Sequence, residues 1–286
     1  MIDENSFGII GGDSRQAALA ESIASDGFTV LAAGFDRTDL AAPVKKAGLE
    51  EIVESCANII LPLPVTADGI HVKMDCGDDK IVLDDAFAAQ MRGKEVFGGM
   101  MGKLYQTSDI WGTINTHDYY AREEFAVRNA VPTAEGAIEI AMREFPGTLN
   151  GSRCLVAGFG RVGKMLAWML HGIGARVSVS ARRPSDLAWI ESYGYETVRS
   201  DQICEDASYE VIFNTVPAVL FNRRVLSRMK GKPLLVDLAS RPGGVDDAAA
   251  EKIGIRVIHA LSLPGKAAPR AAGEIMKNTI YNILEE

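Results

Sequence analysis

Long hydrophobic runs and closely spaced metal ligands are both missing from this chain of 286 residues. No uninterrupted apolar stretch reaches the ~18 residues that a membrane-spanning helix needs. The first residues are acidic and lack the basic segment and apolar core of a signal peptide. The four cysteines are scattered without metal-ligand spacing, and no H-E-x-x-H occurs, so we expect no metal site. We therefore expect reduced thiols and a cytoplasmic protein that does not bind a membrane.

Positive charge is in short supply. The chain has 30 lysines and arginines against 38 acidic residues, a formal net charge of −8. This balance argues against nucleic acid and anionic membrane as partners. It does not exclude an acidic substrate, because a local pocket can be basic in an acidic protein. The length and the 47% hydrophobic content suit two domains of ordinary size.

A glycine-rich turn is the most informative feature that is present. Gly158, Gly160 and Gly163 form a G-x-G-x-x-G between an apolar run at 154–157 and a segment of helical periodicity at 164–171. In this strand–turn–helix context the glycines allow a tight turn, close approach of a pyrophosphate, and helix–strand packing. The free N–H groups of the helix N-terminus then bind the phosphates. We predict that the whole turn, with Phe159, Arg161 and Val162, binds a dinucleotide, the alternative being an ordinary tight turn.

An acidic residue is missing where the second strand of this domain should end. Such an acid, about 20 residues after the first glycine, normally holds the ribose hydroxyls of NAD. Here the expected strand at 175–179 ends in Ser180, followed by Arg182 and Arg183. A carboxylate would repel a 2′-phosphate, whereas guanidinium groups form charge-assisted hydrogen bonds with it. We therefore predict NADP in preference to NAD; a solvated arginine pair is the alternative, and NAD stays open.

Strand and helix patterns alternate in both halves of the chain. Strands are predicted at 7–10, 29–33, 58–61, 95–98, 211–213, 234–236 and 255–258, with a helix at 17–25. This alternation predicts the α/β class, with two Rossmann-like domains, each built on a parallel sheet. The C-terminal one is the doubly wound dinucleotide-binding domain.

Two helices, at 121–131 and 134–145, are expected to bridge the domains. Pro132 should break them, with Thr133 as the N-cap of the second. A last helix at 271–284 should cross back to the N-terminal domain. The expected domains are therefore 1–130, joined by the helix within 270–286, and 131–269. The first should carry the substrate and the second the dinucleotide.

Ligands of open α/β sheets gather at the carboxyl ends of the strands. The residues after each strand of the C-terminal half are therefore candidates. For the cofactor cleft they are Asn214, Thr215, Val216 and Pro217, which form an Asx turn in the alternative interpretation. For the substrate they are Ser240, Arg241, Pro264, Gly265 and Lys266.

The N-terminal half offers an anion site at its first strand–helix turn. Gly12, Asp13, Ser14 and Arg15 would combine backbone N–H groups, a helix dipole and a guanidinium for a substrate carboxylate. The alternative is that Asp13 simply caps the helix. Lys103 is a further candidate for a carboxylate or a plain surface residue. His117 could transfer a proton, although a lone histidine is more often structural.

The ordered set of motifs resembles the A subunit of bacterial dipicolinate synthase over nearly the whole chain. The resemblance rests on the glycine turns at 11–16 and 158–163, on Pro-Thr-Ala-Glu-Gly-Ala-Ile at 132–138, on Asn-Thr-Val-Pro-Ala at 214–218, on Asp-Leu-Ala-Ser-Arg-Pro-Gly-Gly at 237–244, and on Leu-Pro-Gly-Lys-Ala-Ala-Pro at 263–269. A wider similarity extends to alanine dehydrogenases and to the nucleotide-binding domain of transhydrogenases. Arg241 stands where alanine dehydrogenases often carry an acid, which favours a substrate with an extra carboxylate over amino-acid deamination.

The resemblance implies an oxidoreductase of spore formation. Such an enzyme oxidises dihydrodipicolinate to dipicolinate, pyridine-2,6-dicarboxylate, in the mother cell, together with a flavoprotein-like B subunit. Arg15 and Lys103 would then hold one carboxylate, Arg241 or Lys266 the other, Thr133 would also contact the substrate, and His117 or water would take the proton.

Two other functions stay open. One is a 2-hydroxyacid or amino-acid dehydrogenase of similar architecture, and the other is a nucleotide-binding regulatory subunit without turnover of its own. Assembly into a homo-oligomer is also left open by the sequence.

Overall fold

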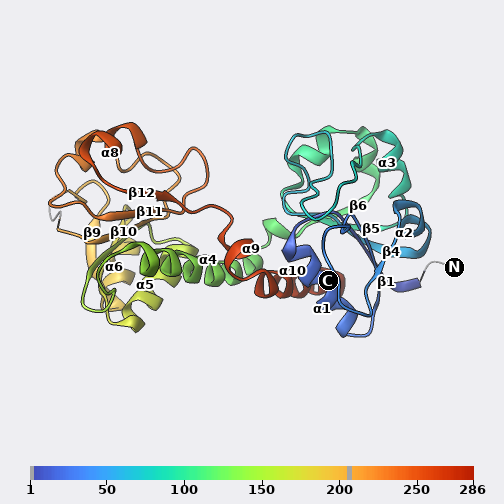
Figure 1. Cartoon of the computed structure of the whole chain (residues 1–286), viewed down its shortest axis with the longest axis horizontal. Helices are drawn as coiled ribbons and strands as arrows, with labels where there is room; N and C mark the ends of the chain where they lie inside the picture. Colours follow the sequence, from blue (N-terminus) through green and yellow to red (C-terminus); the bar gives the residue numbers. More distant parts are fainter. Residues whose placement is uncertain (1–2, 205–207) are drawn as a thin grey trace. The chain divides into compact units, whose positions relative to one another are not determined.

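The computed structural model describes residues 3–204 and 208–286. Contacts divide the chain into two compact units. Unit 1 comprises Met1–Asn129 and Ala268–Glu286, and unit 2 comprises Ala130–Ala267. The sequence had placed these boundaries at 130/131 and 269/270. Each unit is built on a six-stranded parallel sheet, which confirms the predicted α/β class (Figure 1).

The sheet of unit 1 has the order β3-β2-β1-β4-β5-β6. Its strands are β1 Asp3–Ile10, β2 Thr29–Ala33, β3 Lys45–Lys46, β4 Cys56–Ile60, β5 Glu95–Gly98 and β6 Asn115–Asp118. The helices are α1 Ser14–Ser25, α2 Leu49–Ser55, α3 Asp85–Gln90 and α10 Pro269–Glu285, with short 3-10 turns η1 Met101–Gln106, η2 Asp109–Thr113 and η3 Tyr119–Ala121. The two outermost strands, β3 and β6, were not predicted, because both are short and polar.

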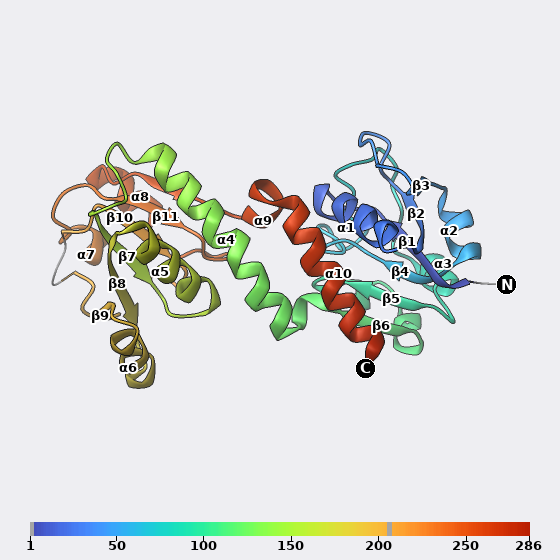
Figure 2. The same cartoon turned by 90° about the horizontal axis from the view of Figure 1, so that it is seen from below.

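Helices cover both faces of this sheet. On one face α1 packs beside α10, which the two views show side by side (Figures 1 and 2). Leu19 and Ile23 of α1 meet Met276 and Ile280 of α10 in a fully buried core over Phe7 of β1. The last helix therefore completes the core of the unit that the first strand begins.

The sheet of unit 2 has the order β12-β11-β10-β7-β8-β9. Its strands are β7 Arg153–Ala157, β8 Arg176–Ala181, β9 Glu196–Arg199, β10 Val211–Asn214, β11 Leu234–Asp237 and β12 Val257–His259. The helices that belong wholly to this unit are α5 Arg161–Ile173, α6 Pro184–Ser192, α7 Arg223–Leu226, α8 Asp247–Ile253 and α9 Leu263–Ala267. The chain moves outward from β7 to β9 and then returns to β10 on the other side of β7. The strand order therefore reverses between β7 and β10, which is where doubly wound sheets bind ligands.

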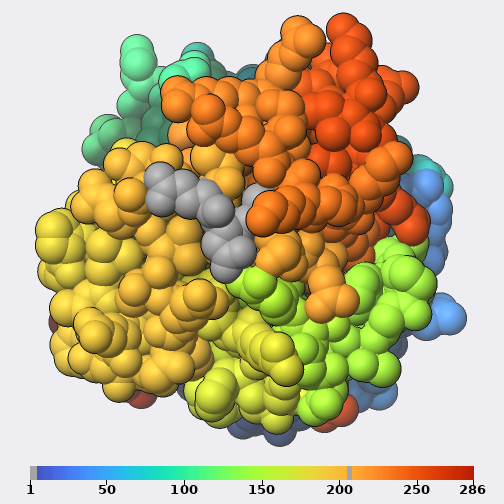
Figure 3. Space-filling view, turned by 90° about the vertical axis from the view of Figure 1, so that its left-hand side faces the viewer, coloured from blue at the N-terminus to red at the C-terminus, as the bar shows by residue number. Residues whose placement is uncertain are grey.

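Segments distant in sequence meet on one face of unit 2 (Figure 3). The segment between α4 (Glu123–Glu144) and β7, in lime, lies there near the gold region around α6 and β9 and near the orange segments after β10. The core beneath combines residues from all parts of the unit, among them Val156, Leu166, Val179, Phe213 and Val236.

One prediction about the helices is wrong. A single helix, α4 Glu123–Glu144, replaces the two expected helices, and Pro132 lies inside it. Thr133 is therefore an internal helix residue and not an N-cap. An internal proline costs roughly 3 kcal/mol, since it removes one hydrogen bond and crowds the preceding turn. The buried stripe of Ala134, Ala137 and Ala141 packs into the core of unit 2 and offsets this cost.

The membrane prediction can be checked on the described helices. None of those in residues 3–204 and 208–286 is both long and apolar enough to span a bilayer.

Candidate functional site

Each of the three glycines in the turn between β7 and α5 has a different structural role: one forms the tight turn, one leaves open space, and one lets the helix touch the strand. Gly158 has φ +99°, in the left-handed region, and a Cβ there would lie 2.5 Å from Thr215 Oγ1. A Cβ on Gly163 would lie 2.1 Å from the carbonyl oxygen of Gly158, so α5 touches the strand end. A Cβ on Gly160 would meet nothing within 4 Å. The first and third glycines are thus required by the fold, and the second leaves open space for a ligand.

The N-terminus of α5 faces this open space without a cap from its own side chains. The N-cap residue is Gly160, which has no side chain to donate or accept, and the first turn contains no acidic residue. An uncapped N-terminus with a positive dipole end is suited to phosphate. Phe159 is buried, its ring 6.2 Å from that of Tyr193, so it supports the turn from within. The residues present therefore fit a dinucleotide.

The end of β8 lies against this turn, because the Gly158 amide donates to the Ser180 carbonyl at 3.0 Å. Arg182 and Arg183 follow the strand and are exposed, and neither guanidinium group has a hydrogen bond or ion pair with the residues that the structure describes. The Ser180 side chain, in contrast, is fully buried, and its hydroxyl has no partner among the described atoms. The expected contact between this hydroxyl and a 2′-phosphate is therefore not available, because the side chain points into the core.

Asp237, which ends β11, organises the carboxyl edge of unit 2. It is fully buried. Its Oδ1 accepts from Asn214 Nδ2 at 2.7 Å and from the Ala239 amide at 3.2 Å, and its Oδ2 accepts from the Gly244 amide at 3.1 Å. The Nδ1 atom of His259, the last residue of β12, lies 3.4 Å from the same Oδ2. One carboxylate thus ties together the ends of three strands and the loop 238–244.

The predicted cofactor-cleft residues after β10 shape the backbone instead of projecting outward. Asn214 is buried, and its side chain donates to the Val216 carbonyl and accepts from the Val216 amide, which closes an Asx turn. Thr215 Oγ1 donates to the Ala157 carbonyl at 2.8 Å, next to the glycine turn. Val216 is half-buried and Pro217 is exposed. Side chains of this segment therefore hold the turn, and only its outer part faces solvent.

Two predicted cations at this edge are free to meet an anion. The side chains of Arg241 and Lys266 are both exposed and have no hydrogen bond or ion pair with any described residue. Ser240, next to Arg241, is also exposed. Pro264 is buried within α9, and Thr133 is half-buried within α4.

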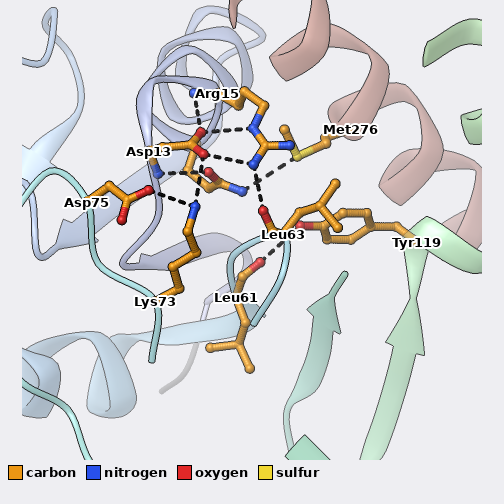
Figure 4. Close-up of polar contacts among 9 residues, drawn as sticks. Asp13, Arg15, Leu61, Leu63, Lys73, Asp75, Tyr119 and Met276 are labelled. Atoms are coloured by element: carbon orange, nitrogen blue, oxygen red, sulfur yellow. Dashed lines mark hydrogen bonds and ion pairs between the residues drawn. The ribbon is translucent and has the colours of Figure 1, made fainter. Parts of the chain in front are cut away.

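The first strand–helix turn of unit 1 carries a compact polar cluster (Figure 4). Asp13 is the N-cap of α1, and its side chain and that of Gln16 form a capping box. Arg15 is only 12% exposed. Its Nε donates to Asp13 Oδ1 at 2.9 Å, and its Nη2 donates to Asp13 Oδ2 at 2.7 Å and to the Leu63 carbonyl at 2.6 Å. The arginine is thus held in a fixed orientation by the residue that caps its own helix.

Charges alternate through this cluster. Lys73 Nζ lies 3.4 Å from Asp13 Oδ2 and 2.7 Å from Asp75 Oδ2. Burial raises the pKa of Asp13, but the hydrogen bond and charge of Arg15, helped by Lys73, outweigh it and hold this pKa below its usual value. Burial lowers the pKa of Arg15, and its bond to Asp13 reverses the effect, so that the pKa is raised. Both groups are therefore charged at neutral pH. Sequence reasoning missed Lys73 and Asp75, which lie in irregular chain.

Tyr119 lies next to the cluster, beside Leu61 and Leu63 (Figure 4). It is fully buried, its hydroxyl donates to the Leu61 carbonyl at 3.1 Å, and burial raises its pKa, so it stays neutral. Gly12 is buried and Ser14 is exposed at the turn itself.

The two other candidates of unit 1 lie outside this cluster. Lys103, on η1, is exposed and donates to the Ala67 carbonyl at 2.7 Å. The His117 ring stacks on Phe97 with 5.1 Å between centroids, and its Nε2 lies 2.7 Å from Glu95 Oε2. Glu95 begins β5, so this contact directs the imidazole toward the amino edge of the sheet and away from the edge where ligands bind. We therefore omit His117 from the proposed site.

Comparisons with known proteins agree with this geometry. The family model for the N-terminal domain of the dipicolinate synthase A subunit matches residues 6–107. The model for the NAD binding domain of D-isomer specific 2-hydroxyacid dehydrogenases matches residues 124–253. The second match includes the glycine turn and the end of β8.

Full-length relatives cover both units. The dipicolinate synthase A subunit of Bacillus subtilis (strain 168) is 31% identical over 282 residues, which are 97% of this chain and 95% of the relative. The crystal structure of the dipicolinate synthase A subunit from Bacillus halodurans has a TM-score of 0.88 at 30% identity and covers 100% of this chain and 99% of that one. The transhydrogenase of Sinorhizobium meliloti shares the fold, with a TM-score of 0.69 at 16% identity over 97% of this chain and 92% of that one.

These matches confirm the predicted family and a nicotinamide dinucleotide as the cofactor. The open space at Gly160 and the uncapped α5 N-terminus supply the physical basis for that site in this chain. The chain is an NAD(P)-dependent oxidoreductase that belongs to the family of dipicolinate synthase A subunits.

Proposed function

We propose that this protein oxidises dihydrodipicolinate to dipicolinate with hydride transfer to NADP⁺, in the cytoplasm of a spore-forming mother cell. The observation that carries the proposal is the similarity to a dipicolinate synthase A subunit over 97% of the chain, joined to a dinucleotide turn with open space at its second glycine. The relative is named as one subunit of a synthase, which also supports a partner, the B subunit, with which the chain would act.

The dinucleotide would be held by three elements of unit 2. The backbone at Gly160 and the N-terminus of α5 would bind the pyrophosphate, and Arg182 and Arg183 would bind the 2′-phosphate of NADP⁺. Two exposed guanidinium groups without partners in the described chain support this assignment, and NAD⁺ is the alternative that lacks the 2′-phosphate. The bound dinucleotide supplies the hydride acceptor.

Each unit carries cations suited to a carboxylate of the substrate. In unit 1, Arg15 is oriented by Asp13 and the Leu63 carbonyl and would offer the outer side of its guanidinium to a carboxylate of the substrate. In unit 2, Arg241 or Lys266 would bind a carboxylate. Both have no partner in the described chain, so they bind an anion without first losing an ion pair.

The reaction needs orientation more than acid–base strength. A hydride leaves one ring carbon with its bonding electrons, a proton leaves the neighbouring ring position to water, and the ring becomes aromatic. Correct placement of reactants can contribute ~7–11 kcal/mol. Asp237 would act as a positioning residue, because its bonds to the Ala239 and Gly244 amides fix the loop that carries Ser240 and Arg241.

The test follows the absorbance of reduced nicotinamide with the purified chain and freshly generated dihydrodipicolinate. NADP⁺ and NAD⁺ are compared, each with and without the B subunit. Reduction by this chain alone, faster with NADP⁺, is the expected result. Reduction only when the B subunit is present would move part of the chemistry to the complex, and NADP⁺ binding without any reduction would favour a regulatory role.

The variant Arg15→Ala separates substrate recognition from cofactor binding. It should raise the KM for dihydrodipicolinate more than the KM for NADP⁺. The exposed Arg92 near α3 provides the control, Arg92→Ala, which should change neither constant. If Arg15→Ala also changes neither, the carboxylate site in unit 1 is wrong.

A 2-hydroxyacid dehydrogenase is the second candidate, because residues 124–253 match the NAD binding domain of that family. Turnover of lactate-like acids at rates above those with dihydrodipicolinate would support it.

A further inference from the structure

Met100 of unit 1 has a backbone conformation that methionine rarely adopts. It follows β5 at the carboxyl edge of the sheet and has φ +59° and ψ +53°, in the left-handed region. Within residues 3–204 and 208–286, only Met100 and Ser262 combine a side chain with a positive φ. Glycine adopts this conformation freely, whereas a side chain is crowded against the backbone. The turn therefore carries a strained side chain where its geometry favours glycine.

Asp118, the last residue of β6, holds this turn in place. Its Oδ1 accepts from the Met100 amide at 3.1 Å, and its Oδ2 accepts from the Met101 amide at 3.1 Å. Met101 is fully buried, whereas Met100 is 50% exposed. Strained residues persist where the surrounding structure fixes them, and they cluster at ligand sites. The fold thus buries one methionine and keeps the other at the surface in a fixed position.

One short loop, which follows β4, connects the Met100 turn with Arg15. The Leu63 carbonyl of this loop accepts from Arg15 Nη2 at 2.6 Å (Figure 4). The Gly99 amide donates to the Pro62 carbonyl at 3.1 Å, and a Cβ on Gly99 would lie 2.5 Å from Leu63 Cδ1. The space between the loop and the turn is therefore filled, so the backbone of Met100 is fixed relative to the guanidinium of Arg15.

The spacing along the sheet edge suits a small ring that bears a carboxylate. Arg15 follows β1 and Met100 follows β5, and β4 lies between these two strands. Neighbouring strands are about 4.8 Å apart, so the ends of β1 and β5 are roughly 10 Å apart. Ligands of parallel sheets bind at this carboxyl edge. A guanidinium and an apolar side chain therefore face the same ligand edge at a separation on the scale of one substituted ring.

We propose that Met100 is a specificity-determining residue that packs its thioether against the ring of the substrate while Arg15 binds a carboxylate. The inference rests on the proposed function, because the ring is that of dihydrodipicolinate. A thioether sulfur makes favourable contacts with aromatic rings. The ring becomes aromatic as it loses a hydride to the nicotinamide and a proton to water, so the contact strengthens along the reaction. Met100 therefore selects ring dicarboxylates over open-chain ones of the same charge.

The test compares Met100→Gly with the wild type in the full chain saturated with NADP⁺. Calorimetry measures the Kd for dipicolinate and for pimelate, an open-chain dicarboxylate with the same number of carbons. The Kd for dipicolinate and the KM for dihydrodipicolinate should rise about 3- to 10-fold, and the Kd for pimelate should stay within about twofold. The melting temperature should not fall, because glycine relieves the strained backbone.

Two further variants show that the effect belongs to the side chain. Met100→Leu restores an apolar side chain without the sulfur and should recover part of the lost affinity for dipicolinate. The matched control is Val127→Ala, since Val127 is an apolar residue of unit 1 on α4 that is 44% exposed. It should change neither the Kd for dipicolinate nor the KM for dihydrodipicolinate.

An unchanged Kd for dipicolinate in Met100→Gly overturns the inference. An equal loss for pimelate also overturns it, because the carboxylate site would then be disturbed instead of a ring contact. A lowered melting temperature with weaker binding of both would assign Met100 to the fold alone. If the wild type binds dipicolinate but never reduces NADP⁺ with dihydrodipicolinate, the proposed reaction fails, and a weaker dipicolinate complex in Met100→Gly would still support the ring contact.

Discussion

One methyl group, added at either of two glycines in the β7–α5 turn, should separate the stability of the fold from the binding of the cofactor. In Gly163→Ala the new Cβ would lie 2.1 Å from the Gly158 carbonyl oxygen, a backbone atom that no rotamer change can move. Helix α5 must then retreat from β7 by about 1 Å to restore an ordinary contact. Overpacking of this kind typically costs ~1–3 kcal/mol. We expect Gly163→Ala to melt several degrees lower and to bind nucleotide weakly as a consequence.

Gly160→Ala should behave in the opposite way. The backbone of Gly160 has φ −80° and ψ −166°, which alanine adopts readily, and its Cβ would meet nothing within 4 Å. The loss of an N-cap glycine costs less than about 1 kcal/mol, so the melting temperature should change little. The methyl group would occupy the open space that we assign to the pyrophosphate. The loss of one charge-assisted hydrogen bond, worth ~1.5–3 kcal/mol, raises the Kd for NADP⁺ and NAD⁺ alike by roughly 10- to 150-fold.

The assay pairs a thermal melt with calorimetric titration of NADP⁺ and NAD⁺ for both variants. Wild-type affinity in Gly160→Ala would refute the assignment of the open space to the pyrophosphate. An unchanged melting temperature in Gly163→Ala would refute the tight contact between helix and strand.

Further substitutions test the other parts of the site. The double variant Arg182→Ala with Arg183→Ala should raise the Kd for NADP⁺ at least about 10-fold and leave NAD⁺ within about twofold, as titration of both nucleotides would show. Asp237→Asn turns an amide donor toward the N–H groups that the carboxylate now accepts. It should therefore destabilise the protein by ~1–3 kcal/mol in denaturant unfolding and lower kcat; wild-type stability would contradict the positioning role. Because the pKa of Asp13 is lowered from 3.8 in the folded state, its pairing with Arg15 adds stability above about pH 4, which is lost as the pH falls through the lowered value. The stability difference between wild type and Asp13→Asn should thus be full at pH 6 and shrink below pH 4, and a constant difference would count against the pair.

Local patterns in the sequence were sufficient where one short segment determines its own structure. The β7–turn–α5 unit is such a case, because the apolar strand, the glycine spacing and the helical periodicity are contiguous. The same holds for β2 and β5, whose bounds agree with the predicted segments 29–33 and 95–98. The edge strands β3 and β6 could not be found in this way. Their polar residues form strands only because a neighbouring strand offers hydrogen bonds.

Contacts between distant segments explain most of what was missed at the site. Lys73 meets Asp13 from 60 positions away, and Asp237 meets Asn214 from 23 positions away. Neither pairing can be predicted from the spacing of residues along the sequence. The burial of Ser180 was hidden for another reason, since strands of a parallel sheet are covered on both faces and show no alternation to reveal which way a side chain points. Pro132 led to a wrong prediction for a related reason. Proline usually ends a helix, but here the packing of α4 against the core keeps the helix continuous through it.

The path of the chain through unit 1 has a consequence for synthesis on the ribosome. The residues of unit 2 are contiguous, so that unit can fold as soon as residue 267 has emerged. The first segment of unit 1 emerges earlier but cannot complete its core, because α10 covers the apolar face of α1 and follows unit 2 in the sequence. Leu19 and Ile23 therefore stay uncovered while the rest of the first segment of unit 1 and then all of unit 2, residues 130–267, are added. A chain cut before α10 would leave the apolar face of α1 in unit 1 uncovered.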